Sequence, residues 1–216
     1  MIEKLMSPPV AAVDSFVDPQ DAFLMGEEVE MVWQAAEKRR REFTTARWCA
    51  RRALALLDVP PMPILRGERG APRWPEGTVG SLTHCDGYRA AAVARATEVL
   101  SIGIDAEPHL PLPGTVLDAI ALPSEAGRMA GLRAKDPALC WDRLLFSTKE
   151  SVYKAWFPLT GRWLGFDQAD ITLHSDETFH AKLLAPAPEV PGGEFTGRWA
   201  VADGLIATAI VVPRTR

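Results

Sequence analysis

Two short segments, about forty residues apart, carry residue types that could bind a cation and an anionic substrate. The first segment, residues 103–108, reads G-I-D-A-E-P and contains Asp105 and Glu107. The second, residues 146–154, reads F-S-T-K-E-S-V-Y-K and contains Glu150 between two lysines. Adjacent carboxylates repel one another unless a cation or basic groups neutralise them. Mg²⁺ is the natural candidate, because it prefers oxygen ligands and often joins carboxylates to the phosphates of a substrate.

A predicted strand over residues 100–107 positions the first pair of acids. Side chains along a strand alternate between its two faces. Asp105 and Glu107 therefore emerge together on one face, while Ile102 and Ile104 turn toward a core. The ordinary alternative is a solvated strand end with two ordinary acids, because D-x-E is a short and common pattern.

A predicted helix over residues 139–157 positions the second segment. At ~100° per residue, Glu150 and Lys154 lie one turn apart and nearly opposite the main apolar stripe, whereas Lys149 lies at the edge of that stripe. This second face also carries apolar groups, so we expect Glu150 to line a cleft. The ordinary alternative is a helical Glu–Lys pair that contributes only ~0.3–0.5 kcal/mol.

A run of basic residues lies within a helix predicted over residues 27–57. A break in this helix near Thr44 and Thr45 is possible. Between residues 38 and 52 the local charge is +6, although the whole chain carries −4. Arginine binds phosphate through two-pronged hydrogen bonds, and Arg66 and Arg69 in a predicted loop over residues 64–77 could add to such a site. A solvated helix face is the ordinary alternative. The seven basic residues are Lys38, Arg39, Arg40, Arg41, Arg47, Arg51 and Arg52.

A predicted strand over residues 79–84 ends on Thr83 and His84, and a turn follows at residues 85–87. Cys85 and His84 do not form a convincing nucleophile pair, because neighbours in a strand face opposite ways and catalytic pairs are normally distant in sequence. A hydroxyl and an imidazole at a strand end could contact phosphate, and a purely structural histidine is the alternative.

Composition limits the remaining possibilities. The 216 residues are 47% hydrophobic, and a pI of about 5.6 gives no reason to expect nucleic-acid binding. No apolar run approaches the ~20 residues that span a bilayer. Asp14, Asp18 and Asp21 interrupt the N-terminal residues, so we expect no signal peptide. Three cysteines without a C-x-x-C pair favour a reducing compartment. We expect a cytoplasmic protein that does not associate with membranes.

The other predicted elements complete an α+β chain. Residues 1–25 and 108–124 are expected to be irregular, and residues 124–133 helical. Residues 88–94 return as a strand or begin a helix, and residues 185–193 form a flexible loop. Four further strands are predicted at residues 171–174, 179–184, 197–202 and 205–212. Two α+β halves, residues 1–103 and 104–216, are expected to meet near residue 103.

The joint order of S-L-T-H, G-I-D-A-E-P and F-S-T-K-E-S-V-Y-K-A-W resembles the 4′-phosphopantetheinyl transferases of the surfactin/enterobactin-synthase type. The resemblance covers about residues 30–170 and is strongest to the actinobacterial branch. It implies a monomeric pseudo-dimer of two similar α+β halves with coenzyme A and Mg²⁺, or Mn²⁺ as an alternative, in the cleft between them. The implied reaction moves phosphopantetheine from coenzyme A to a serine of acyl, aryl or peptidyl carrier proteins of polyketide and nonribosomal-peptide synthesis. Its other product is adenosine 3′,5′-bisphosphate.

The resemblance also implies roles for individual residues. The metal would be held by Asp105, the carbonyl of Ala106, Glu107 and Glu150. Glu150 or a metal-bound water would be the general base, Lys154 would stabilise or protonate the departing diphosphate, and Lys149 and Asp105 complete the catalytic set. Where many relatives read G-K-P, this chain reads G-A-P at residues 70–72, so a lysine contact to phosphate is missing. The implied coenzyme A contacts are Arg39, Arg47, Arg66, Gly67, Glu68, Arg69, Thr83, His84, Asp105, Glu150 and Lys154.

Two other function classes stay open on the residues. A non-catalytic coenzyme A or nucleotide-binding module would be expected to lack one of the acids or lysines, and all are present. Another Mg²⁺-dependent phosphotransferase would be favoured by a Walker-type glycine loop, which the sequence lacks. The segment over residues 157–164, with Arg162, is expected to form part of the surface on which an acidic carrier protein docks.

Overall fold

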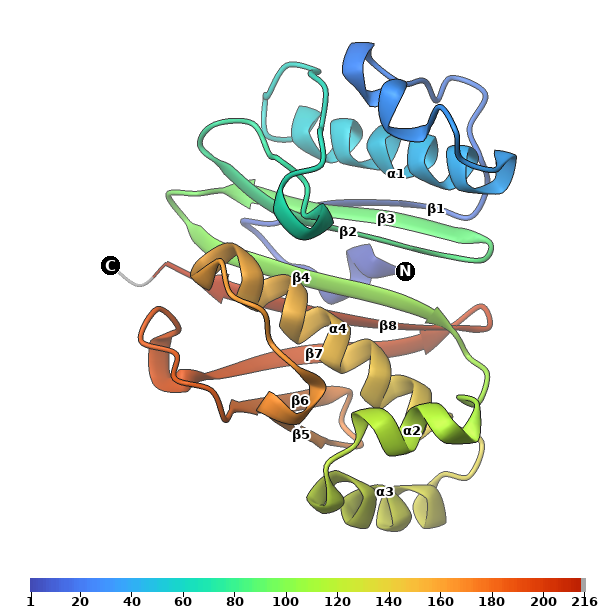
Figure 1. Ribbon diagram of the computed structural model, residues 1–216, viewed down its shortest axis with the longest axis vertical. Helices are drawn as coiled ribbons and strands as arrows, with labels where there is room; N and C mark the ends of the chain where they lie inside the picture. Colours follow the sequence, from blue (N-terminus) through green and yellow to red (C-terminus); the bar gives the residue numbers. More distant parts are fainter. Residues whose placement is uncertain (215–216) are drawn as a thin grey trace.

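The computed structural model describes residues 1–214 and shows a mixed α+β protein built on two antiparallel sheets (Figure 1). The strands are β1 (Ala11–Ser15), β2 (Thr78–Cys85), β3 (Tyr88–Arg95), β4 (Val99–Pro108), β5 (Ala169–Leu173), β6 (Thr178–Leu183), β7 (Glu194–Ala202) and β8 (Leu205–Pro213). The smaller sheet has the order β1-β3-β2, and the larger has the order β4-β8-β7-β6-β5. Each sheet carries one long helix, so the predicted α+β fold of two similar halves is confirmed.

The N-terminal half packs helix α1 (Glu37–Ala55) on the three-stranded sheet. Small apolar residues of the helix, such as Ala50 and Ala53, meet Ala91 and Val93 of β3 in a buried cluster. Residues 86–87 form the β2–β3 turn, where Gly87 has a φ of 73° that other residues rarely adopt. The predicted second strand after this turn is confirmed as β3.

Two expectations for the first sixty residues are wrong, and a possible break in the helix is absent. Strand β1 lies in a region expected to be irregular, and it joins the sheet beside β3. Helix α1 begins at residue 37 rather than 27, because Glu28 turns inward and accepts hydrogen bonds from Arg51 and from the backbone N–H of Ile64. The helix is also unbroken at Thr44 and Thr45, whose hydroxyls donate to Arg40 O and to a carboxylate oxygen of Asp18.

The C-terminal half packs helix α4 (Trp141–Thr160) on the five-stranded sheet, with α3 (Pro123–Lys135) and α2 (Gly114–Ile120) beyond its N-terminal end (Figure 1). Helix α4 continues through Pro158 to Thr160, beyond Phe157 where the prediction ended it, and Gly161 follows with a φ of 64°. Helix α2 contradicts the expectation of irregular chain, because seven residues are too few for a readable helical period. No helix in the described part of the chain has the length and apolarity needed to cross a membrane.

Strand β4 joins the two halves. One edge pairs with β8 from Val99 to Pro108. At its other edge, the N–H groups of Ile104 and Ala106 donate to the hydroxyls of Ser81 and Thr83 in β2, at 3.1 and 3.0 Å. Hydrogen bonds from backbone to side chain therefore stand here in place of the backbone–backbone hydrogen bonds of a continuous sheet. The predicted division between residues 103 and 104 falls inside this strand, and the extent of each half stays a prediction.

Helix α4 lies unusually close to β4 at Gly103. A Cβ atom at Gly103 would lie 2.0 Å from the carbonyl oxygen of Ser151 and 2.8 Å from the backbone nitrogen of Ala155. Ser101 donates to the carbonyl of Ala155 at 2.8 Å, and Ser151 bonds to Thr208 of β8. These contacts fix the height and rotation of α4 above the strand that carries the acids.

Candidate functional site

A cavity of about 420 Å³ lies between the two halves. Helix α1, the loop over residues 66–74 and strand β2 form its N-terminal side, and helix α4 forms its C-terminal side. It brings together the basic run, the Thr83–His84 strand end and the Glu150 segment, which the sequence separates widely. The sequence-predicted residues that line it are Arg39, Arg47, Arg66, Arg69, Thr83, His84, Glu150 and Lys154.

Arginines form one end of the cavity. The guanidinium of Arg47 is buried, lies 3.7 Å from the centre of the Phe43 ring and donates through Nε to Ile64 O. Arg66 lies over the same ring at 5.1 Å. Burial lowers the pKa of Arg47 to about 10, with Arg66 adding repulsion, yet the group stays charged at neutral pH. A buried arginine with further arginines beside it is suited to bind phosphate groups.

The histidine beside these arginines is neutral at physiological pH. Burial and, to a smaller extent, the charge of Arg39 together lower the pKa of His84 to about 4. Arg39 donates to Nε2 of His84, so the ring accepts at this nitrogen. The neighbouring hydroxyl of Thr83 donates to Asp105 Oδ1 at 3.3 Å and thereby connects the N-terminal half to the acids.

Of the three predicted acids, Glu150 lines the cavity, whereas Asp105 contacts the lining residues Thr83 and Lys154. Asp105 is 5% exposed, and Lys154 lies 2.8 Å from its Oδ1 and 3.1 Å from Ile104 O. Glu107 pairs with Arg143 at 2.9 Å. Burial raises the pKa of both Glu107 and Glu150, and the charge of Asp105 adds to both shifts. Strand alternation therefore placed Asp105 and Glu107 correctly, and helix geometry placed Glu150 and Lys154 correctly.

The acid cluster does not form a closed metal site in the described residues. Asp105 Oδ2 is buried and has no hydrogen-bond partner among the described residues. Ala106 directs its N–H toward β2, so its carbonyl points to that same edge of the strand, where Ile104 O meets Lys154. Within residues 1–214, no three His, Cys, Asp or Glu side chains form a ready-made ligand set. Lys154 and Arg143 neutralise two of the acids instead.

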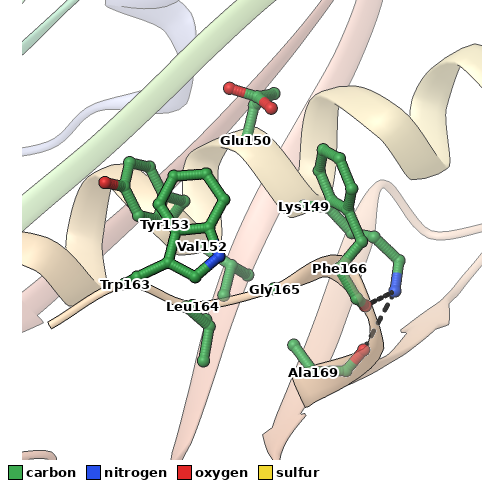
Figure 2. Close-up of a pocket in the computed structure, with 9 residues that line it drawn as sticks. All are labelled: Lys149, Glu150, Val152, Tyr153, Trp163, Leu164, Gly165, Phe166 and Ala169. Carbon is green, nitrogen blue, oxygen red and sulfur yellow. Dashed lines mark hydrogen bonds between the residues drawn. The ribbon is translucent and has the colours of Figure 1, made fainter. Parts of the chain in front are cut away.

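Lys149 does not reach this cavity. A second pocket of about 110 Å³ lies on the other side of Glu150 and Tyr153, which line both spaces. Figure 2 shows the ammonium of Lys149 directed away from Glu150, toward the carbonyls of Phe166 and Ala169 at 2.6 and 3.0 Å. The expectation of a catalytic Lys149 is therefore not met by the geometry, because its ammonium is buried among these acceptors.

Three further placements complete the comparison with the sequence. Gly67 and Glu68 belong to the arginine loop but do not line the cavity in the described structure. Arg162 is paired with Glu189 at 2.8 Å, so docking at this segment stays a prediction. Sequence reasoning did not assign aromatic walls or the partner of Glu107 to the site; aromatic residues near the charged motifs were the available signal. The missed residues are Phe43, Trp74, Tyr153, Phe157 and Arg143.

Comparison with known proteins gives one consistent result. Residues 27–94 match the model of the 4′-phosphopantetheinyl transferase N-terminal domain, and residues 101–202 match that of the 4′-phosphopantetheinyl transferase superfamily. The chain is 52% identical to the 4′-phosphopantetheinyl transferase Svp of Streptomyces mobaraensis, over 98% of this chain and 89% of that protein. It is 50% identical to Npt of Nocardia iowensis, over 97% and 99%, and 50% identical to PptT of Mycobacterium tuberculosis, over 94% and 92%.

Proposed function

Because the chain belongs to the 4′-phosphopantetheinyl transferase superfamily, we propose that its inter-half cavity is where phosphopantetheine passes from coenzyme A to a carrier protein. The enzyme is a 4′-phosphopantetheinyl transferase that uses coenzyme A and carrier proteins as its substrates. The observation that supports this location is that one continuous cavity has basic residues in one part and an acid–lysine pair in another. Four arginines line one part, and Glu150 with Lys154 lines another.

The arginine end would take the phosphates of the adenosine part. Arg39, Arg47 and Arg66 present guanidinium groups there, and neutral His84 can accept or donate one hydrogen bond. Arg69 extends this wall toward the second pocket, where its guanidinium lies 5.7 Å from the ring centre of Trp163. The arginine at residue 69 is our candidate replacement for the lysine that the G-A-P loop lacks.

The acids would hold Mg²⁺, with Mn²⁺ as an alternative. The unpartnered Asp105 Oδ2 and the raised pKa values of Glu107 and Glu150 are the features that suit a cation. We assign Asp105, Glu107, Glu150 and the carbonyl of Ala106 as the groups that hold it. When bound, the metal would supply positive charge to neutralise the diphosphate of coenzyme A.

The chain's own residues would then carry the proton and the charge. The serine oxygen of the carrier forms a bond to the phosphorus that bears pantetheine, the diphosphate P–O bond breaks, and adenosine 3′,5′-bisphosphate leaves. Glu150 would accept the serine proton, since burial raises its pKa and makes the carboxylate a better base. Lys154, held beside Asp105, would stabilise the negative charge of the departing group.

The second pocket is suited to the pantetheine arm. It is largely apolar, and it shares Glu150 and Tyr153 with the larger cavity. Figure 2 shows Tyr153 and Trp163 side by side at one end, with ring centres 5.1 Å apart, and Phe166 at the other. An arm that starts at a diphosphate held near Glu150 and Lys154 would therefore enter between these rings. We therefore assign the adenosine part of coenzyme A to the larger cavity and its pantetheine arm to the second pocket.

Cellular setting and oligomeric state are also proposals. All three cysteines, Cys49, Cys85 and Cys140, are free thiols in the structure, which supports a reducing, cytoplasmic location. We propose a monomer, because the site is assembled from the two halves of one chain.

The test is intact-mass analysis of an apo carrier protein incubated with the enzyme, coenzyme A and Mg²⁺. We expect the carrier to gain one phosphopantetheine, and adenosine 3′,5′-bisphosphate to appear in equal amount. A chelator should stop the gain, and added Mg²⁺ should restore it. Carriers of the acyl, aryl and peptidyl types that all keep their apo mass would refute the proposal.

A further inference from the structure

We propose that Glu125 is a positioning residue, which acts through Lys149 to hold the wall of the second pocket in place for the pantetheine arm. The inference rests on the proposed function of that pocket. It concerns a glutamate on α3 that the reaction itself does not use, and it replaces a catalytic role for Lys149 with a structural one.

Glu125 is a buried carboxylate whose polar contacts are to backbone N–H groups and to the ammonium of Lys149. The residue is 1% exposed. Its Oε1 accepts a hydrogen bond from the N–H of Ile171, in the middle of β5, and its Oε2 accepts one from the N–H of Leu122, both at 2.7 Å. Lys149 Nζ lies 2.9 Å from Oε1. One side chain thus connects α3, α4 and β5.

Lys149 uses all its protons in the same assembly. An ammonium group has three N–H donors and no acceptor. Here three acceptors surround it: Glu125 Oε1, Phe166 O and Ala169 O, between 2.6 and 3.0 Å away. Burial lowers the pKa of Lys149, and the charge of Glu125 opposes that shift. No proton of Lys149 remains for a substrate phosphate while this arrangement is intact.

The two carbonyls that Lys149 binds belong to the segment that walls the pocket. Trp163, Leu164 and Phe166 all line it, and Trp163 is 61% exposed and therefore weakly held by packing on its outer side. The segment has short 3₁₀ structure at Phe166–Gln168 and no strand pairing before Ala169. Lys149 directly precedes Glu150 in α4. It consequently supplies two of the hydrogen bonds that hold this wall in place beside Glu150.

Binding of coenzyme A and of adenosine 3′,5′-bisphosphate distinguishes a positioning role from a catalytic role of this assembly. The second ligand lacks the pantetheine arm. We would measure the binding of both ligands by calorimetry in the Glu125→Gln, Lys149→Met and double variants. We expect coenzyme A affinity to fall about tenfold or more, while the affinity for adenosine 3′,5′-bisphosphate stays unchanged. The KM for coenzyme A should rise more than kcat falls. Hydrogen exchange at residues 163–169 should quicken.

Arg128→Ala is the matched control. Arg128 also connects α3 to β5, through Asp170 and the carbonyl of Ile171, but it does not touch the pocket wall. It should leave coenzyme A affinity and loop exchange unchanged. The double variant removes both charges together and leaves no unpaired buried ion, so it keeps the test valid if a single variant folds poorly.

Three results would overturn the inference. One is a Lys149→Met enzyme that loses kcat but keeps its coenzyme A affinity, which indicates a catalytic lysine. Another is equal weakening of both ligands in the variants. The third is unchanged coenzyme A affinity and loop exchange in Glu125→Gln. Failure of the proposed function is distinct, because it would appear as wild-type enzyme that modifies no carrier protein.

Discussion

Gly103→Ala should damage both stability and catalysis, although the residue makes no contact with the substrate. Gly103 lies in β4 beneath helix α4, two residues before Asp105. The added methyl would lie 2.0 Å from Ser151 O and needs about 1.4 Å more space to reach ordinary van der Waals contact. The obstructing atoms are helix backbone, so a side-chain rotation cannot relieve the clash. The helix that carries Glu150 and Lys154 must move instead.

The size of the effect follows from this displacement. Overpacking a core typically costs about 1–3 kcal/mol, and a contact with rigid backbone places Gly103→Ala at the upper end of that range. A misplacement of about 1 Å can reduce turnover about 100-fold. We therefore expect a loss of about 3 kcal/mol in the free energy of unfolding and about a 100-fold loss in kcat.

Urea denaturation and the mass-based transfer assay measure the two effects. Gly127→Ala is the control, because a Cβ atom at this position in α3 meets nothing within 4 Å. Alanine there should leave transfer unchanged and raise stability by about 0.5–1 kcal/mol. If Gly103→Ala matches wild type in both assays, the close approach of α4 to β4 does not set the catalytic geometry.

The remaining predictions concern charges. Transfer by wild type should increase with pH through the raised pKa of Glu150, and Glu150→Gln should lose this inflection together with about 10²–10⁴ of the rate; a retained inflection would identify another base. Lys154→Met should reduce kcat and, by freeing Asp105, tighten Mn²⁺ binding measured by electron paramagnetic resonance; unchanged metal affinity would show that the ion pair does not compete. His84 has a folded-state pKa of about 4 against an ordinary 6.5, so the unfolded chain binds more protons between these values and stability falls on acidification. His84→Asn should lose less unfolding free energy between pH 7 and 4.5 than wild type, and an equal loss would contradict a buried neutral ring.

Local periodicity made part of the site predictable. Alternation in a strand is enough to place Asp105 and Glu107 on one face, and one helical turn is enough to place Glu150 beside Lys154. The same reasoning failed for α2, which is too short to show a period, and for the start of α1. There the chain turns inward because Glu28 pairs with Arg51, a partner 23 residues away.

The residue types of the site, their order and the faces of the elements that carry them can all be read from the amino-acid sequence. It also determined the family resemblance, because motif spacing is a property of the chain alone. The pairing of the charged side chains, in contrast, depends on how the elements pack in three dimensions. Lys149 and Lys154 are both lysines of one helix, yet one bonds Glu125 and the pocket wall while the other bonds Asp105. The direction of each lysine side chain depends on what packs against that side of α4. These neighbours are distant in sequence, so a local sequence pattern cannot predict them.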